Sequence, residues 1–140
     1  MSNQQAPLPQ QNDNSERNKN DPSKGIYTIE SPLPIFSVDW SHREDKPFRL
    51  AFTSFVEKAD NKISIVQLDK EAGKFKLIAS ADHFYPPTKI MWMPYKGTDK
   101  ADLFATTGDV LRIWEMKDSG PVNRCVLNSV CNPISSFSIP

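Results

Sequence analysis

The sequence has few of the residues that mark disulfide-bonded or metal-binding proteins. It contains two cysteines, Cys125 and Cys131, and two histidines, His42 and His83, in 140 residues. This set shows no zinc-ligand pattern, and we expect both cysteines to be reduced thiols. We therefore predict a chain without a metal site and without a cofactor.

Long apolar runs are also missing. No run approaches the roughly 18 residues that a membrane helix requires. The N-terminus is rich in Gln and Asn where a secretory signal would have an apolar core. These absences predict an intracellular chain, cytoplasmic, nuclear or both, that does not bind membranes.

Neither sign of charge is in excess. Seventeen Lys and Arg are balanced by 17 Asp and Glu, so the formal net charge is +0. A protein that binds phosphate backbones directly relies on an excess of Lys and Arg. We therefore expect no direct nucleic-acid partner, and the length leaves room for one modest domain.

Residues 1–25 are expected to form a disordered tail rich in Gln and Asn. The first 24 residues contain nine Gln or Asn, three Pro, and only Met1, Ala6 and Leu8 as apolar side chains. So little apolar surface does not offset the entropy lost on ordering. The tail is either a solvated extension without a role or an arm that recruits a partner.

From residue 26 on, the sequence shows short runs with the two-residue period of strands and no helical period. In the first run Phe36, Val38 and Trp40 share one face, and in a later run Thr88, Ile90 and Trp92 do the same. The predicted strands cover residues 35–40, 49–56, 62–68, 74–79, 88–92, 102–107, 110–116 and 122–127.

Matching positions recur about every 50 residues. Trp92 lies 52 residues after Trp40, Asp109 lies 49 after Asp60, and Ile139 lies 47 after Trp92. A repeat of this length with four strands is typical of β-propeller blades. We predict an all-β fold, an incomplete propeller with two four-stranded antiparallel blades and the first strand of a third. The expected bounds are residues 26–140 for the propeller, about 35–83 and about 84–129 for the two blades, and 134–140 for the third.

Two kinds of propeller blade compete at this length. Kelch blades run about 50 residues and WD blades about 40 to 45, which favours kelch. However, the glycine pair expected after the second strand of a kelch blade is missing. The second blade instead carries a WD pattern in His83, Thr106, Asp109 and Trp114. We predict that these four form a structural hydrogen-bond chain, because a buried indole and a buried carboxylate need partners and an imidazole bonds on both sides.

The first blade matches the WD pattern less well, because Val66 stands where the Trp is expected. The four WD residues of the second blade also allow an enzymatic interpretation. Thr106 or Thr107 would be the nucleophile, His83 the base and Asp109 the group that orients it. Since the WD spacing accounts for the residues and no oxyanion loop is evident, we predict that the chain is not an enzyme. A small β enzyme is the alternative.

Residues 82–89 are the best candidate for a protein-binding loop. Phe84 and Tyr85 are aromatic, and Pro86 and Pro87 make the backbone rigid, a combination that suits interfaces. The alternative is that the two prolines only stiffen the crossover between the blades.

Four strings extend the WD pattern: SPLPIFSVDWS, RLAFTSFVEKADNKISIVQLD, DHFYPPTKIMWMP and DLFATTGDVLRIWEM. They resemble the N-terminal blades of the transparent testa glabra group of WD-repeat proteins, which includes animal relatives. The resemblance covers about residues 26–127. It implies a non-enzymatic scaffold that binds proteins, with a role in transcription regulation or ubiquitination. Plant members join basic helix-loop-helix and MYB transcription factors, and animal members are adaptors for dual-specificity kinases and cullin-type ubiquitin ligases.

The chain also departs from this family. Members continue for several more blades, whereas this sequence ends at Pro140, and Ser138-Ile139-Pro140 replaces the expected Asp-Trp. We expect a fragment, a diverged short product or a nonfunctional truncation. Because propeller blades bury both faces against neighbours, two blades leave apolar faces open. Self-association or partial unfolding of the 140-residue chain is therefore predicted.

Overall fold

The computed structural model describes residues 25–57 and 60–128. The predicted tail before residue 25, the predicted third-blade strand at 134–140 and Cys131 lie outside these residues. Cys125 is a free, exposed thiol.

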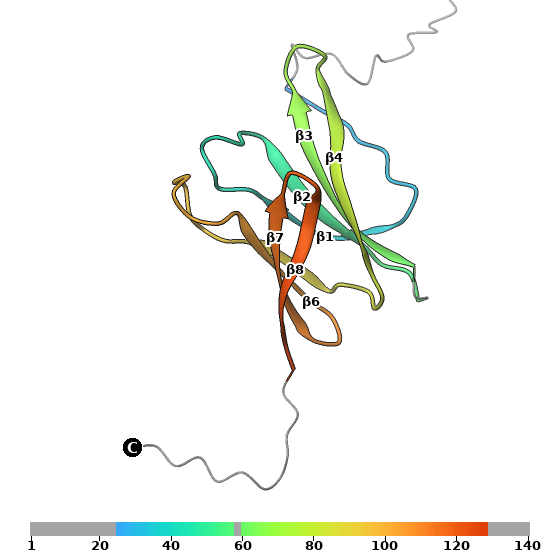
Figure 1. The fold of residues 1–140 in the computed structure, drawn as a ribbon. Coiled ribbons are helices and arrows are strands. Elements are labelled where there is room, and N and C mark those ends of the chain that lie inside the picture. The colour runs from blue at the N-terminus through green and yellow to red at the C-terminus, as the bar shows by residue number, and fades with distance from the viewer. Residues whose placement is uncertain (1–24, 58–59, 129–140) are drawn as a thin grey trace, which may run out of the picture.

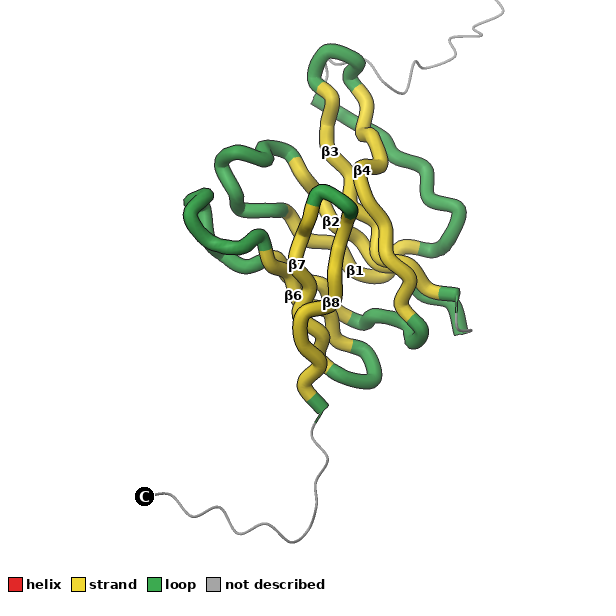
Figure 2. Tube along the Cα trace, in the orientation of Figure 1, coloured by secondary structure: helices red, strands yellow, loops and turns green. Residues whose placement is uncertain are grey.

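The described residues form two antiparallel sheets of four strands each (Figures 1 and 2). In each sheet the strands follow one another in sequence order. The first sheet consists of β1 (Ile35–Trp40), β2 (Arg49–Ser54), β3 (Asn61–Asp69) and β4 (Lys74–His83). The second consists of β5 (Lys89–Trp92), β6 (Leu103–Thr107), β7 (Leu111–Lys117) and β8 (Gly120–Leu127). The predicted all-β class with two four-stranded meanders is therefore confirmed.

Strand positions follow the alternation in the sequence. In β5, Ile90 and Trp92 are buried while Lys89 and Met91 are exposed, as the two-residue period predicts. β4 exceeds its predicted bounds of 74–79 more than any other described strand. β4 continues to His83 because its last residues pair with the first residues of β3, ending with Asn61 opposite His83.

The two sheets repeat the same register. Leu50 pairs with Trp40 and Val66 in the first sheet, and Phe104 pairs with Trp92 and Trp114 in the second. Val66 thus occupies the place of Trp114, as the sequence indicates.

One predicted equivalence shifts by a residue. The pair Thr53–Ile63 corresponds to the pair Thr107–Leu111. Counting back two residues from Ile63 and Leu111 places Asn61, not Asp60, at the position of Asp109. Asn61 closes its own turn, since its Oδ1 accepts from the Val56 N–H at 2.7 Å and its Nδ2 donates to the Val56 carbonyl at 2.9 Å.

The core lies between the two sheets. It contains apolar side chains of both: Ala51, Ile63, Ile65, Ile90, Trp92, Phe104 and Trp114. The edge strands β1 and β5 are joined by side chains, since Ser37 Oγ accepts from the Ile90 N–H at 3.1 Å and Asp39 Oδ2 accepts from the Trp92 N–H at 2.7 Å. One face of the first sheet is therefore closed by the second.

The segment before β1 adds no strand to the first sheet. Residues 26–30 are not in a strand, and the Tyr27 ring contacts Phe75 edge-on at 6.4 Å between centroids. No helix able to cross a bilayer occurs in residues 25–57 or 60–128.

Candidate functional site

Three of the four predicted WD residues form a buried hydrogen-bond chain in the second sheet. Trp114 on β7 donates its indole N–H to Thr106 Oγ1 on β6 at 2.8 Å. Thr106 Oγ1 lies 3.3 Å from Nε2 of His83, at the end of β4 in the other sheet. The chain thereby ties the last strand of the first sheet to the centre of the second.

His83 is 2% exposed and its Nδ1 bonds to the Tyr85 carbonyl. Burial lowers the pKa of the His83 imidazole below its usual value, and the contact with the Tyr85 carbonyl opposes this shift. The ring is therefore neutral at physiological pH. A neutral ring with Nδ1–H donating to the carbonyl leaves Nε2 as an acceptor for the Thr106 hydroxyl.

Asp109 lies outside this chain. Both of its carboxylate oxygens accept from Arg112, at 2.6 and 3.1 Å, and among the described residues no hydrogen bond joins Asp109 to His83. The Arg112 guanidinium lowers the pKa of Asp109 to about 2. Asp109 influences His83 only through its charge, which favours the protonated ring.

The crossover loop between β4 and β5 presents two aromatic side chains to solvent. Phe84 is 63% exposed and Tyr85 is 50% exposed, and their rings contact edge to face with centroids 5.0 Å apart. Pro87 is fully buried, and its carbonyl accepts from the Thr53 hydroxyl at 3.0 Å. The buried side of the loop holds the backbone in place while the aromatic side stays free of contacts to the core.

Pro86 fixes the same loop from the other side. Its carbonyl lies 2.9 Å from the position that a Cβ on Gly108 would occupy, in the turn between β6 and β7. A glycine is needed at residue 108 because a side chain would meet backbone that cannot move freely. The loop is thus packed against strands of both sheets.

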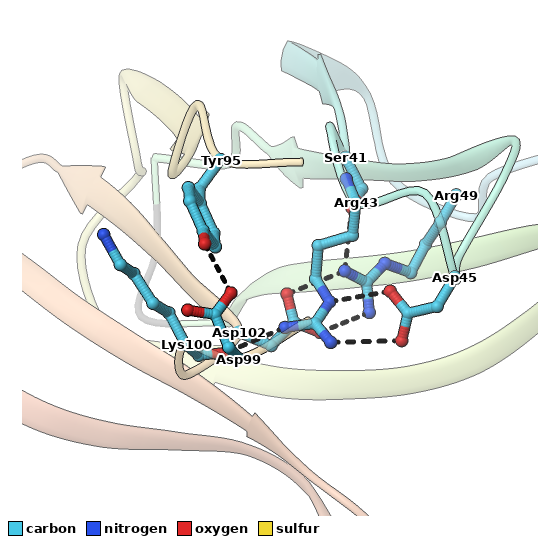
Figure 3. Close-up of polar contacts among 8 residues, drawn as sticks. All are labelled: Ser41, Arg43, Asp45, Arg49, Tyr95, Asp99, Lys100 and Asp102. Carbon is cyan, nitrogen blue, oxygen red and sulfur yellow. Dashed lines mark hydrogen bonds and ion pairs between the residues drawn. The ribbon is translucent and has the colours of Figure 1, made fainter. Parts of the chain in front are cut away.

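A second polar cluster joins the opposite ends of the sheets. Arg49, at the start of β2, is 2% exposed and forms two bonds to Asp102, at 2.6 and 2.8 Å (Figure 3). It also donates to Ser41 Oγ at 2.8 Å, and its guanidinium carbon lies 4.2 Å from the centre of the Trp92 ring. This buried ion pair fixes how the second blade sits on the first.

Exposed loops surround this ion pair. Arg43 binds both oxygens of Asp45, at 2.9 and 3.1 Å, and donates to the Lys100 carbonyl at 2.9 Å. Figure 3 shows Tyr95 pointing toward Asp99, which accepts from its hydroxyl. The Arg43–Lys100 contact therefore connects the loop after β1 to the loop after β5 beside the Arg49–Asp102 pair.

The contacts of the two threonines bear on the enzymatic alternative. Thr106 is 0% exposed, and its hydroxyl oxygen already accepts from the Trp114 indole. Thr107 Oγ1 lies on the exposed side, 3.4 Å from Thr88 Oγ1. A nucleophile needs access to substrate as well as to a base, and Thr106 lacks this access. Across residues 25–57 and 60–128, no group of three or more His, Cys, Asp or Glu is placed to hold a metal ion.

Sequence reasoning did not identify the Arg49–Asp102 pair. Its only signal is an arginine directly before the apolar run Leu50-Ala51-Phe52, where a charge would be buried without a partner. The partner lies 53 residues away and is not indicated by any local pattern.

The two meanders, the shared register and the His83–Thr106–Trp114 chain define a WD-repeat protein. Over 120 residues the chain is 42% identical to a protein of Dictyostelium discoideum described as a DDB1- and CUL4-associated factor 7 homolog. Over 91 residues it is 28% identical to a WD repeat-containing protein of Saccharomyces cerevisiae. These matches confirm the resemblance to WD-repeat proteins of the transparent testa glabra group that the sequence strings indicate.

The matches cover most of this chain and a minor part of each relative. They span 81% of this chain and 37% of the Dictyostelium protein, and 65% of this chain and 16% of the yeast protein. No family model matches the chain.

Proposed function

We propose that the chain acts as a non-enzymatic adaptor that binds other proteins through the crossover loop. The observation that carries the proposal is the exposed aromatic pair Phe84 and Tyr85 on a backbone that Pro86 and Pro87 hold rigid. Rigid aromatic side chains give a large contact area with little loss of conformational entropy, and they are enriched among residues that dominate binding energy.

The partner that the comparisons favour is a component of a cullin-type ubiquitin ligase. The Dictyostelium relative is described by its association with DDB1 and CUL4. The family resemblance adds transcription factors and dual-specificity kinases as further partners. We propose an intracellular setting because these partners are intracellular.

The contacts of His83, Thr106 and Trp114 support a structural role rather than catalysis. The three side chains satisfy one another inside the sheet pair. Asp109 is committed to Arg112 and does not orient the imidazole. The proposal therefore assigns the WD residues to the scaffold and the loop to binding.

The test is a titration of the chain onto immobilised, purified DDB1–CUL4 complex by biolayer interferometry. The double variant Phe84→Ala/Tyr85→Ala should weaken the affinity about 30-fold, the loss expected for two central aromatic contacts worth about 2 kcal/mol in total. The matched control is Val122→Ala, a side chain that is 42% exposed on β8 and pairs with Glu115 at the end of the sheet opposite the Gly108 turn. An unchanged affinity of the double variant, with a preserved circular dichroism spectrum, would overturn the assignment of the loop. No binding by the wild-type chain would overturn the choice of partner.

A further inference from the structure

His83 bonds on both sides of its ring, and the two partners belong to different parts of the molecule. Nε2 lies 3.3 Å from the hydroxyl oxygen of Thr106, inside the pair of sheets. Nδ1 contacts the carbonyl oxygen of Tyr85, in the crossover loop. His83 is 2% exposed, so the ring is shielded from solvent. One buried side chain therefore connects the blade core to the loop that carries the exposed aromatic pair.

The Nδ1 contact is where the chain differs from the hydrogen-bond chain that its sequence predicts. Asp109 is the predicted second partner of His83, but Arg112 donates to both carboxylate oxygens of Asp109, at 2.6 and 3.1 Å. Among the described residues, Nδ1 meets the Tyr85 carbonyl instead. Because a carbonyl oxygen can only accept, Nδ1 carries the proton of the neutral ring, and Nε2 accepts from the Thr106 hydroxyl.

The Nδ1 contact spans Phe84. It runs from the side chain of residue 83 to the carbonyl of residue 85, and so closes a ring of bonds that includes the backbone of Phe84 and Tyr85. Such a local bond from a side chain to the backbone restricts the torsion angles of the residues that it encloses. The rings of Phe84 and Tyr85 contact edge to face at 5.0 Å between centroids, and this contact depends on the same backbone.

The rest of the loop is held at the next two carbonyl groups. The Pro87 carbonyl accepts from the Thr53 hydroxyl at 3.0 Å. The Pro86 carbonyl packs closely against the turn between β6 and β7. Of the three held carbonyls, only that of Tyr85 belongs to a residue with an exposed aromatic side chain. The His83 contact is therefore the anchor that acts most directly on the aromatic pair.

We propose that His83 is the positioning residue of the crossover loop: its Nδ1–H holds the Tyr85 carbonyl and thereby presents Phe84 and Tyr85 to a partner as a rigid pair. The inference rests on the proposed adaptor function and deepens it, because it assigns part of the affinity to a buried residue that no partner touches. His83 has two separable roles. Nε2 serves the stability of the blades, and Nδ1 serves binding at the loop.

Two substitutions of His83 each keep one of the two nitrogen positions. In His83→Asn, the amide nitrogen takes the place of Nδ1 and donates to the Tyr85 carbonyl, while the acceptor for Thr106 is lost. In His83→Gln, the longer side chain brings its amide oxygen to the place of Nε2 as an acceptor for Thr106, while the donor to the loop is lost. Affinity is measured on immobilised DDB1–CUL4 complex and stability by urea unfolding.

The two variants should have opposite effects on affinity and stability. His83→Asn should bind within about twofold of the wild type although it unfolds at a lower urea concentration. His83→Gln should bind about five- to tenfold more weakly, the change in affinity that one lost hydrogen bond produces. The matched control is Thr106→Val, which removes the partner of Nε2 and should lower stability without changing affinity. If His83 were only structural, affinity would follow stability in all three variants.

Two nuclear magnetic resonance measurements on the 140-residue chain need no partner. The nitrogen chemical shifts of the His83 ring should show that Nδ1 carries the proton. Nuclear Overhauser contacts between the rings of Phe84 and Tyr85 should be present in the wild type and in His83→Asn, and weaker in His83→Gln. Circular dichroism verifies that each variant is folded. The ring shifts are measured on the wild type, so they test the hydrogen bond even where a substitution prevents folding.

Any of three results would overturn the proposal: an imidazole protonated at Nε2, equal affinities of the wild type and folded His83→Gln, or an affinity loss in Thr106→Val as large as that in His83→Gln. Absence of wild-type binding to DDB1–CUL4 would instead overturn the choice of partner. In that case the ring shifts and the contacts between the aromatic rings still decide whether His83 holds the loop, so the two failures are distinguishable.

Discussion

Removing the carboxylate of Asp102 should destabilise the chain more than any change at an exposed ion pair. In Asp102→Ala, the Arg49 guanidinium keeps its bond to Ser41 but loses both bonds to Asp102. Arg49 is 2% exposed, so water does not replace the lost acceptor. Breaking one partner of a buried ion pair costs about 3 to 5 kcal/mol, because an uncompensated charge is left behind.

Replacing both partners should recover most of this loss. The variant Arg49→Leu/Asp102→Phe takes the apolar residues that stand at the corresponding positions of the other sheet, Leu103 for Arg49 and Phe48 for Asp102. A buried ion pair exchanged for apolar side chains of similar volume is often neutral or stabilising. The double-mutant cycle should therefore show a coupling free energy of about 2 kcal/mol or more between the two positions.

The assay is urea unfolding followed by tryptophan fluorescence at a concentration where the chain is monomeric. The control is Asp82→Ala, which removes an exposed partner of Lys62 and should leave the midpoint unchanged. If Asp102→Ala costs less than about 1 kcal/mol while Arg49 stays in place, the ion pair does not hold the two blades together, and the reasoning is wrong.

Three further changes test other contacts. Trp114→Ala should cost about 3 to 5 kcal/mol, because it removes a buried aromatic ring and a donor to Thr106; a loss below about 1 kcal/mol contradicts the strand assignment. Burial lowers the folded pKa of His83, so stability should be complete above the unfolded pKa of about 6.5 and should decline as the pH falls below it. His83→Gln should flatten this decline in urea titrations, and an unchanged slope refutes the argument. Gly108→Ala should lower the free energy of unfolding by about 1 to 3 kcal/mol, because the added Cβ meets the Pro86 carbonyl. An unchanged melting temperature would mean that the loop moves to accommodate the Cβ.

The sequence alone determined the strands and the repeat. Alternation at Ile90 and Trp92 is a local pattern, because neighbouring residues of a strand point to opposite faces whatever the strand packs against. The spacing of His83, Thr106 and Trp114 was equally informative, since the Trp114 indole finds its acceptor, Thr106, on the neighbouring strand.

Tertiary structure decided which polar groups became partners. Asp109 was expected beside His83, but Arg112, three residues further on in β7, holds it instead. Arg49 reaches Asp102 only because the second blade packs against the first in one relative orientation. The Arg49–Asp102 pairing depends on distances across the blade interface, which no local pattern encodes.

Trp40 and Trp92 show the same contrast between what the sequence predicts and what the tertiary structure decides. Trp40 and Trp92 occupy equivalent positions, and their sequence neighbourhoods predict the same packed face. Yet Trp92 is 3% exposed and Trp40 is 50% exposed. Burial of an apolar side chain requires a second surface at contact distance, and only the arrangement of the blades determines which of two equivalent faces receives one.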